Sequence, residues 1–564
     1  MAKWIYPNVK LDDLKNDKDL ARLSDVALQV LVNRGFTDAS SIKRFLYSGM
    51  SDIHDPRKLK DAEKATDIMI DAIKNGEPIV VYGDYDCDGV CSTTVMTDLL
   101  RKAGGKVEYF TNNRFIHGYG MSPSGVDDML ALFPDTKLIV TVDNGIMAHE
   151  GVEYAKSKGI RVVVTDHHEQ GETLPNADAI VDPKRKDCEY PFAGLCGAGV
   201  AFKIMLLLYW KMEKSLETVY DTLDIVALAT VGDIVPLIDE NRILVKEGLK
   251  KIQNQDRMVF KVFQEVTGAK VVNAHYTLAF QYVPMVNAIG RLDGDPRQAI
   301  DMFFEADESV VKGTIEYLKE VNDSRKQMTE TQCQEAEEII ERKGLKHVLV
   351  VYKEDFHEGI VGLIAGRLKE KYNRPVFVLT KHKDVIKGSG RGIDGFHLKE
   401  ALDELAKESL IAGGGGHAKA CGLSLTEAML DGFERKVNEM AEKCLTEDDF
   451  QKVYHVDYVL NPGEVDLHVI EDLQELEPFG EAFSKPTLVV DGFNVDRTFN
   501  MGSEKQHLKL INGSLSLIAW SGTELYSDLG QPKRVKAIGY PELNIWNNKV
   551  SVQFIVDNDN LQPA

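Results

Sequence analysis

The chain of 564 residues has little of several features that mark whole classes of protein. Its seven cysteines are an odd number, lie far apart and include no CxxC pair, which argues against a disulfide framework or a zinc knuckle and for reduced thiols. No uncharged apolar run is long enough to span a membrane, and the N-terminus MAKWIYPNVKLDDLKND has no apolar secretory core. We therefore expect a cytoplasmic protein with no membrane segment.

Basic charge is also scarce. The chain has 67 Lys and Arg against 89 Asp and Glu, a formal net charge of -22. Such a balance counts against a general nucleic-acid binder, although an acidic protein can still carry a local basic groove. A site for divalent metals needs carboxylates of its own. Whether the chain binds nucleic acid, divalent metals or both must therefore be judged from local patterns of residues.

The length predicts three or four domains. From about residue 76 to 233, apolar runs (EPIVVYG, KVEYF, KLIVTVD, IRVVVTD and DAIVD) alternate with helical stretches. This alternation predicts a parallel sheet covered by helices on both faces, with ligands bound beyond the carboxyl ends of its strands.

The other segments have different patterns. Residues 198–280 look mainly helical, and 305–343 are polar, helical in period and free of proline, which predicts one or two long connecting helices. After 453, short β-like segments predict a small barrel or sandwich, an OB-type barrel being one candidate. The expected α/β architecture has a helical segment (1–75), a parallel-sheet domain (76–300), a connecting helix (301–344), a second α/β domain (345–448) and an OB-like β-barrel (449–564).

Carboxylates and histidines follow several of the apolar runs of the first domain. The set comprises Asp84, Asp86 and Asp88 in VYGDYDCDGV, Asp143 in VTVDNG, Asp166, His167 and His168 in VVVTDHHEQG, and Asp233 in LATVGDIVP. The alternation of the first three predicts that they project to one face of an extended segment. A single Asp at such a place is as often a turn or helix-cap residue, so the argument depends on the set.

Acids that converge at one rim of a sheet repel each other unless cations neutralise them. Carboxylates mixed with imidazole suit two divalent ions of the manganese or magnesium kind, which serve phosphoryl chemistry. Neighbouring side chains in an extended strand end point apart. One histidine would then bind metal while the other faces a phosphate, unless the pair is simply solvated or part of the core.

The motifs DYDCDG, VDNG, DHH and GDIVP, in this order and spacing, resemble the DHH phosphoesterase superfamily. NRFIHGYG, the DP at 182–183, GAGVAFK, VNAIGRLD, GSGRG and GGGGHAKACG resemble the RecJ family within it, closely over about residues 70–425. GLCGAG at 194–199 loosely matches a dinucleotide-binding fingerprint, but it does not follow the first strand, so packing at a helix start explains it better.

The resemblance implies roles for individual residues. It implies that Asp86 and Asp88 bind the first and second metal, that Asp143 bridges both, and that His167 and Asp233 also bind the second metal, with Asp84 near the first. It further implies that His168 contacts the scissile phosphate, that Arg291 stabilises the transition state and that Arg114 receives a 5′-terminal phosphate. Asp166 is expected to orient the histidine pair.

A local basic stretch marks the second α/β domain. Eight Lys or Arg stand against two acids between Arg367 and Arg391. In GSGRG, glycines around Ser389 and Arg391 would expose backbone N–H groups as a phosphate cradle. The run Gly413–Gly416 with His417 is expected to let the backbone, at Gly415 and Gly416 in particular, approach a phosphodiester, or else to form a tight turn before a helix.

The combined expectation is an exonuclease that degrades single-stranded DNA from 5′ to 3′ with two divalent ions, Mn²⁺ or else Mg²⁺. As the resemblance implies, it would act in repair and recombination as a monomer beside a single-strand-binding protein and a RecQ-type helicase. Phe493, Phe499, Trp520 and Tyr540 could stack bases, although most of them are expected to be core. The alternatives are a DHH pyrophosphatase, a nano-RNA or cyclic-dinucleotide phosphodiesterase, and a replication scaffold without activity.

Overall fold

A computed structural model describes residues 3–6, 14–113, 116–118, 120–269, 274–292, 294–546 and 549–564. The chain forms two compact units. The larger unit contains Trp4–Asn287, Asp295–Ile315 and Tyr454–Ala564, and the smaller unit contains Met1–Lys3, Ala288–Gly294 and Glu316–Val453.

The larger unit is built on a five-stranded sheet in the order β3-β2-β4-β5-β6, in which every pair is parallel. Its strands are β2 (Pro78–Gly83), β3 (Lys106–Thr111), β4 (Leu138–Val142), β5 (Arg161–Thr165) and β6 (Ala179–Val181). These are the five predicted apolar runs, so the parallel sheet is confirmed. The strand order reverses between β2 and β4, and a crevice at such a reversal is the usual ligand site of open α/β sheets.

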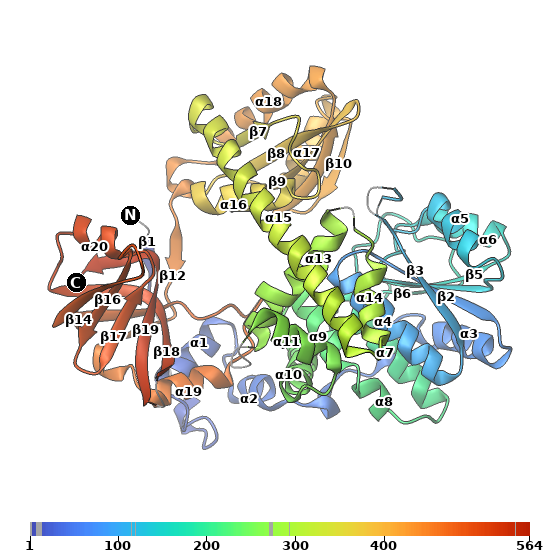
Figure 1. Ribbon diagram of the computed structural model, residues 1–564, viewed down its shortest axis with the longest axis horizontal. Helices are drawn as coiled ribbons and strands as arrows, with labels where there is room; N and C mark the ends of the chain where they lie inside the picture. The colour runs from blue at the N-terminus through green and yellow to red at the C-terminus, as the bar shows by residue number, and fades with distance from the viewer. Residues whose placement is uncertain are drawn as a thin grey trace. The chain divides into compact units, whose positions relative to one another are not determined.

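Helices cover both faces of this sheet (Figure 1). On one face, α5 (Pro123–Leu132) and α6 (His149–Ser157) share a core with the strands, to which Met129, Val152 and Tyr82 belong. On the other face lie α4 (Cys87–Ala103), α7 (Gly197–Lys211) and α9 (Leu223–Gly232), which pack against one another. Helix α7 is buried along most of its length, as its apolar sequence on all sides predicts.

The remaining helices agree with the predicted helical segments. Before the sheet lie α1 (Asp25–Asn33), α2 (Ala39–Tyr47) and α3 (Ala62–Lys74). After it come α8 (Glu217–Tyr220), α10 (Asp239–Asn254), α11 (Met258–Thr267), α12 (Ala274–Thr277), the π-helical turn η5 (Leu278–Tyr282), α13 (Val283–Arg291) and α14 (Arg297–Phe304). The predicted connecting helix is the single 36-residue α15 (Glu308–Lys343), whose first turns belong to the larger unit and the rest to the smaller.

The smaller unit contains a second five-stranded sheet in the order β10-β11-β9-β8-β7. Its strands are β7 (Leu349–Tyr352), β8 (Val376–His382), β9 (Val385–Arg391), β10 (Gly413–Gly416) and β11 (Ala420–Leu425). Helix α16 (Val361–Tyr372) covers one face together with α15, and α17 (Leu398–Lys407) and α18 (Leu430–Cys444) cover the other. Because β9 lies between β8 and β11, its backbone takes part in two ladders.

The C-terminal part of the larger unit is a seven-stranded sheet in the order β13-β14-β18-β19-β17-β16-β15. Its elements are β13 (Tyr458–Leu460), α19 (Leu467–Glu475), β14 (Leu488–Asn494), β15 (Arg497–Met501), β16 (His507–Asn512), β17 (Leu515–Ala519), α20 (Thr523–Asp528), β18 (Arg534–Trp546) and β19 (Lys549–Pro563). The β-rich domain is as predicted. Among the described residues no ladder joins the end strands β13 and β15, so the expected closure into a barrel is not seen.

Arg242 of α10 ties this C-terminal part to the rest of the larger unit. Its guanidinium, fully buried, donates to the carbonyl oxygens of Phe45, Glu477 and Pro478 at 2.9–3.2 Å. It also lies over the ring of Phe45, 3.9 Å from the centroid. One side chain therefore joins three segments that are far apart in sequence.

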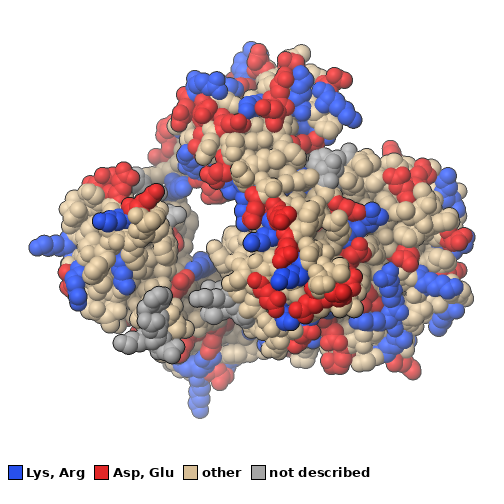
Figure 2. Space-filling model, viewed as in Figure 1, with Lys and Arg blue, Asp and Glu red and all other residues tan. Residues whose placement is uncertain are grey.

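The surface carries mixed charge. In the face shown in Figure 2, groups of Lys and Arg are interspersed with groups of Asp and Glu among other residues. Of the helices in the described part of the chain, none has the length and apolar character that crossing a bilayer requires.

Candidate metal centre

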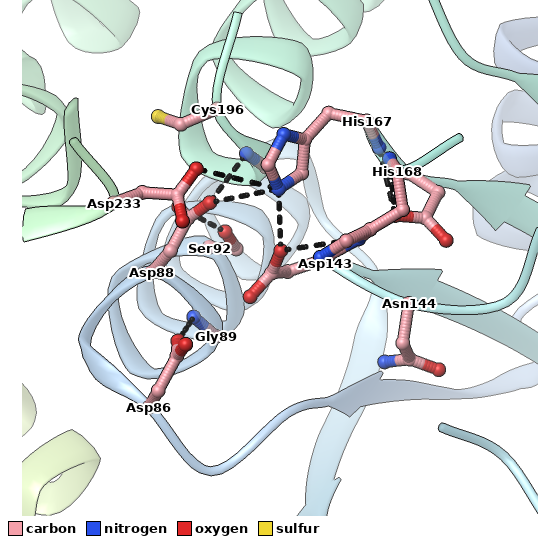
Figure 3. Close-up of polar contacts among 12 residues, drawn as sticks. Asp86, Asp88, Gly89, Ser92, Asp143, Asn144, His167, His168, Cys196 and Asp233 are labelled. Atoms are coloured by element: carbon pink, nitrogen blue, oxygen red, sulfur yellow. Dashed lines mark hydrogen bonds and ion pairs between the residues drawn. The ribbon is translucent and has the colours of Figure 1, made fainter. Parts of the chain in front are cut away.

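The predicted carboxylates and histidines gather at the carboxyl rim of the first sheet (Figure 3). Nε2 of His167 lies 3.0 Å from Oδ1 of Asp143, 3.5 Å from Oδ2 of Asp88 and 3.6 Å from Oδ2 of Asp233. Two sets of side chains are close enough to share an ion: Asp143 with His167 and His168, and Asp88 with His167 and Asp233. The structure therefore brings together five of the side chains that the sequence singled out.

The local conformation differs from the prediction at two of the acidic segments. Strand β2 ends at Gly83 and α4 begins at Cys87, so the aspartates do not alternate along an extended segment. Instead Asp86 caps α4, its Oδ1 accepting from the Gly89 N–H at 3.1 Å, and Asp88 lies in the first turn. Asp233 follows helix α9 and not a strand. Acids reach the rim from helix ends as well as from strand ends.

The carboxylate of Asp88 is held by three hydrogen bonds. The hydroxyl of Ser92 donates to its Oδ1 at 3.1 Å, and the first backbone N–H groups of α7, from Gly197 and Ala198, donate at 2.6 and 2.9 Å. A helix N-terminus supplies both spare N–H groups and a favourable dipole for an anion. The sequence explained the segment from Gly197 only as helix-start packing, so this anchoring role was missed. An apolar helix whose first residues are small was the available signal.

Glycines give the site its close packing. A Cβ on Gly197 would lie 2.6 Å from Cβ of Asp143, and one on Gly89 would lie 2.5 Å from the backbone of Asp84. Asp143 itself has a φ of 58°, in the left-handed region that aspartate tolerates better than most residues. The side-chain amide of Asn144 donates to the carbonyl oxygens of Tyr82 and Val142. These contacts fix the loop after β4, and with it the carboxylate of Asp143.

The pKa values of the two histidines are shifted in opposite directions. Burial lowers the pKa of His167 to about 4, against the attraction of Asp88, so its imidazole is neutral and able to bind metal. Burial also opposes the cation on His168, but the hydrogen bond to Asp166 at 2.7 Å and the charge of that carboxylate raise its pKa to about 9. The rings are not turned apart as predicted: their centroids are 4.3 Å apart.

Asp166 orients this pair by accepting three hydrogen bonds from the two histidines, and a fourth from Ile146 holds Asp166 itself. Its Oδ1 accepts from the backbone N–H groups of His167 and His168 as well as from Nδ1 of His168, and its Oδ2 accepts from the Ile146 N–H. Although burial opposes its charge, these bonds and the imidazolium hold the pKa of Asp166 below its ordinary value.

The remaining carboxylates have too little positive charge near them to balance their own. Burial and the neighbouring carboxylates raise the pKa of Asp143 well above its ordinary value and that of Asp233 to about 8. Burial and the charge of Asp86 likewise raise the pKa of Asp84, whose Oδ1 is buried with no hydrogen-bond partner in the described part of the chain. Oxygen and imidazole donors without thiolate fit Mn²⁺ or Mg²⁺. Asp84 and Asp86 belong to neither of the two ligand sets.

The second sheet places Ser389 and Arg391 differently from the predicted cradle. Both lie in the inner strand β9, whose backbone is used by its two neighbours, so the glycines do not present free N–H groups. On the face of the sheet opposite Ser389 and Arg391, Gly388 leaves room for Leu379, and Gly390 leaves room for Phe377 and Cys421. The glycines are explained by packing, and a bound anion would have to be held by side chains.

Those side chains meet the first turn of α16. A Cβ on Gly362 would lie 3.0 Å from Nη2 of Arg391 and 3.2 Å from Oγ of Ser389. Nη1 of Arg391 donates to that hydroxyl at 2.9 Å, and burial lowers the pKa of the guanidinium. No carboxylate of the described residues pairs with it, so a half-buried cation at a helix start has room for an anion.

The other substrate-binding candidates are spread over separate elements. Gly413–Gly416 is the edge strand β10, paired with β11, and not a turn before a helix; Gly415 has open space around its Cβ position, Gly416 has a φ of 147° and His417 is exposed. Arg291 ends α13 and donates from Nη1 to the carbonyl oxygen of Gly359 at 3.4 Å. Arg114 lies outside the described residues.

The C-terminal aromatics separate into two groups. Phe493 and Tyr540 are buried in the core, whereas Phe499 and Trp520 are 48% and 51% exposed. Only the second pair has a ring available to a base.

Family models match three segments of the chain: the DHH family N-terminal domain at residues 78–230, the DHHA1 domain at 345–444 and the RecJ OB domain at 456–558. With the metal centre at the rim of the first sheet, these matches define a protein of the DHH class. The chain is 35% identical to the single-stranded-DNA-specific exonuclease RecJ of Escherichia coli, with 95% of this chain and 96% of the relative covered. It is 32% identical to the protein of the same name from Bacillus subtilis, with 98% and 70% covered.

Solved structures agree. The crystal structure of RecJ in complex with Mn²⁺ from Thermus thermophilus matches with a TM-score of 0.84 and 25% identity, over 100% of this chain and 80% of that one. A crystal structure of exonuclease RecJ bound to manganese matches with a TM-score of 0.59 and 28% identity, over 69% and 96%. The chain belongs to the RecJ family.

Proposed function

We propose that this chain is a metal-dependent phosphodiesterase that degrades single-stranded DNA from its end and releases 5′-mononucleotides. The convergence of Asp88, Asp143 and Asp233 on Nε2 of His167, at 3.0–3.6 Å, carries the proposal. Such a donor set serves divalent ions, and relatives that match nearly the whole chain are named single-stranded-DNA-specific exonucleases. Bound Mn²⁺, with Mg²⁺ as the alternative, supplies a Lewis acid for the phosphodiester and lowers the pKa of water.

Individual side chains of the protein would hold the ions and stabilise the reacting phosphate. Asp143 would bridge the two ion positions, with Asp88, His167 and Asp233 on the second and Asp86 and Asp84 toward the first. His168, whose pKa is raised by the hydrogen bond to Asp166, would neutralise an oxygen of the scissile phosphate. Arg291 would add positive charge in the transition state.

The second sheet would determine the polarity of degradation. Arg391 and Ser389, at the first turn of α16, offer a half-buried cation and a hydroxyl to a 5′-terminal phosphate. Arg114 lies outside the described residues, and its role at the 5′ end stays a prediction from the resemblance. The glycine edge at Gly415 and Gly416 with His417 would follow the strand backbone. Digestion from 5′ to 3′ is the consequence of anchoring that end.

The wider setting is proposed from the resemblance. Exposed Phe499 and Trp520 would stack bases in the C-terminal domain. We place the protein in the cytoplasm as a monomer, in DNA repair and recombination, beside a single-strand-binding protein and a RecQ-type helicase. Mass determination by light scattering and binding assays with those two proteins test the monomer and the partners. We also propose that the chain has five segments with the bounds 1–75, 76–300, 301–344, 345–448 and 449–564.

A substrate panel tests the function. A 5′-phosphorylated single strand, the same strand as a duplex, a dinucleotide and pyrophosphate are incubated with Mn²⁺ and, as control, with EDTA. Mononucleotides should appear from the single strand alone, and only with metal. Faster hydrolysis of the dinucleotide or of pyrophosphate would assign the chain to a shorter-substrate DHH activity. Binding of single strands without hydrolysis of any substrate would leave the scaffold role.

A further inference from the structure

Ile234 has a strained backbone conformation and an exposed side chain, and its packing explains neither. Its φ is 56°, in the left-handed region where a β-branched residue is an outlier, and its side chain is 70% exposed. Glycine or asparagine would occupy this position after a helix with less strain. Backbone strain of this kind persists where the surrounding structure enforces it, and it clusters at functional sites.

The backbone around Ile234 is fixed on both sides. A Cβ on Gly232 would lie 3.1 Å from Val283 and 3.3 Å from Sγ of Cys87, so this end of α9 is closely packed. On the other side the Leu237 N–H donates to the carbonyl oxygen of Glu481 at 2.9 Å, and Leu237 is buried. The chain must therefore turn at Ile234, but its exposed side chain contributes little to the packing.

The position of Ile234 relates it to the metal centre. It directly follows Asp233, whose Oδ2 lies 3.6 Å from Nε2 of His167 within one of the two ligand sets. A phosphodiester held there has a sugar on each side, joined to the phosphorus through an ester oxygen. Ile234 is one residue from this ligand set and its side chain is exposed, so the sugar next to the phosphate is the first part of a bound nucleotide to consider as its contact.

We propose that Ile234 packs against the sugar of a nucleotide that flanks the scissile phosphate and thereby selects deoxyribose over ribose. This inference rests on the proposed function. Its physical cause is the cost of bringing a 2′-hydroxyl against aliphatic carbon without a hydrogen-bond partner. A purely apolar contact rejects an added hydroxyl only moderately, on the order of ten- to a hundredfold. The strain is retained because glycine or asparagine cannot make this contact.

The experiment compares Ile234→Gly with Ile234→Val, which keeps the branched apolar surface. The control is Glu213→Gly, another exposed non-glycine residue with positive φ (53°). Glu213 follows the far end of the 15-residue α7, about 20 Å along the helix from the amides that hold Asp88. Each protein is assayed on a 5′-phosphorylated DNA strand and on strands with a single ribonucleotide in the first or second position.

In the parent, kcat/KM should be about tenfold lower for one of the two ribonucleotide strands than for DNA. Ile234→Gly should lower kcat/KM on DNA about tenfold, change it less than twofold on that ribonucleotide strand, and keep a Tm no lower than the parent's. Ile234→Val and Glu213→Gly should both keep the parent's preference.

Two outcomes would overturn the inference: an unchanged ratio of DNA to ribonucleotide rates in Ile234→Gly, or a fall in Tm that accompanies the fall in rate and so indicates a packing role. Both differ from failure of the proposed function, in which the parent itself would not degrade the DNA strand.

Discussion

The two sheets offer anion-binding groups in opposite ways. At the rim of the first sheet, elements end and begin, so the backbone has spare N–H groups, and α7 uses two of them to hold Asp88. In the second sheet, Ser389 and Arg391 lie along the inner strand β9, whose N–H groups are bonded to β8 and β11. Backbone N–H groups can therefore bind charge at the rim of a parallel sheet, whereas an inner antiparallel strand must use side chains. Changes at the first site should therefore have the larger effects.

The largest effect is expected from Asp143→Asn. Asparagine tolerates the left-handed φ but removes the only carboxylate of one ligand set, which lies 3.0 Å from the histidine common to both sets, so kcat should fall at least about a thousandfold. Because a buried carboxylate that repels its neighbours is lost, Tm in EDTA should not fall, while the rise in Tm on adding Mn²⁺ should shrink. Nuclease assay and thermal unfolding with and without Mn²⁺ measure both. Activity within tenfold of the parent would remove Asp143 from the centre.

Gly197→Ala tests the backbone anchor of Asp88. The new methyl group would lie 2.6 Å from Cβ of Asp143 and 3.0 Å from Oγ of Ser92, so the start of α7 must shift. The loss in kcat is expected to be about 10–100-fold, the usual cost of disturbing a group that orients a metal ligand. Ser92→Ala removes one donor without adding bulk and should cost less. Equal losses in the two variants would contradict the role given to close packing.

Arg391→Ala tests the side-chain site of the second sheet. Loss of the unpaired guanidinium should weaken the preference for a 5′-phosphorylated over a 5′-hydroxyl end about tenfold, with less change on the hydroxyl strand. Competition between the two strands measures this preference. Lys369→Ala, which removes a half-buried cation of α16 paired with Glu370, is the control and should leave the preference unchanged. An unaltered preference in Arg391→Ala would place the 5′ pocket elsewhere.

The smallest effect is expected from Gly415→Ala at the edge strand β10. Its Cβ position has nothing within 4 Å, so Tm should stay the same. If the open backbone there follows a nucleic-acid strand, affinity for a single strand should fall about two- to threefold, measurable by fluorescence anisotropy. Gly416→Ala, at a φ of 147°, should instead lower Tm. Unchanged affinity in Gly415→Ala would assign the glycines to the fold alone.

The strands and the position of the site could be predicted from the sequence, because they follow from the hydrophobic periodicity and from the convergence of polar residues at strand ends. Alternating apolar runs identified the five strands from β2 to β6, and the acids and histidines after them identified the rim. The same patterns do not specify where a strand stops, so the aspartates of DYDCDG were placed on an extended segment when Asp86 in fact caps a helix. A glycine-rich segment such as GSGRG likewise looks the same in a loop and in a strand. Only the residues packed against Gly388 and Gly390 show that it is a strand.

The long-range contacts were beyond sequence reasoning. Asp88 and the amides of Gly197 and Ala198 are more than a hundred positions apart. The opposite pKa shifts of His167 and His168 follow from how deeply each ring is buried and from the contact with Asp166, which the two adjacent letters in the sequence do not reveal.

The anchoring of Asp88 also bears on how mutations accumulate in this chain. Two of its three donors are backbone N–H groups, which every residue type except proline supplies. At Ala198 most substitutions leave the donor in place, whereas at Gly197 the same donor survives but the space for a side chain does not. Space, and not the hydrogen bond, should therefore limit sequence drift at both positions: Ala198 is fully buried, and Gly197 has no room even for a methyl group.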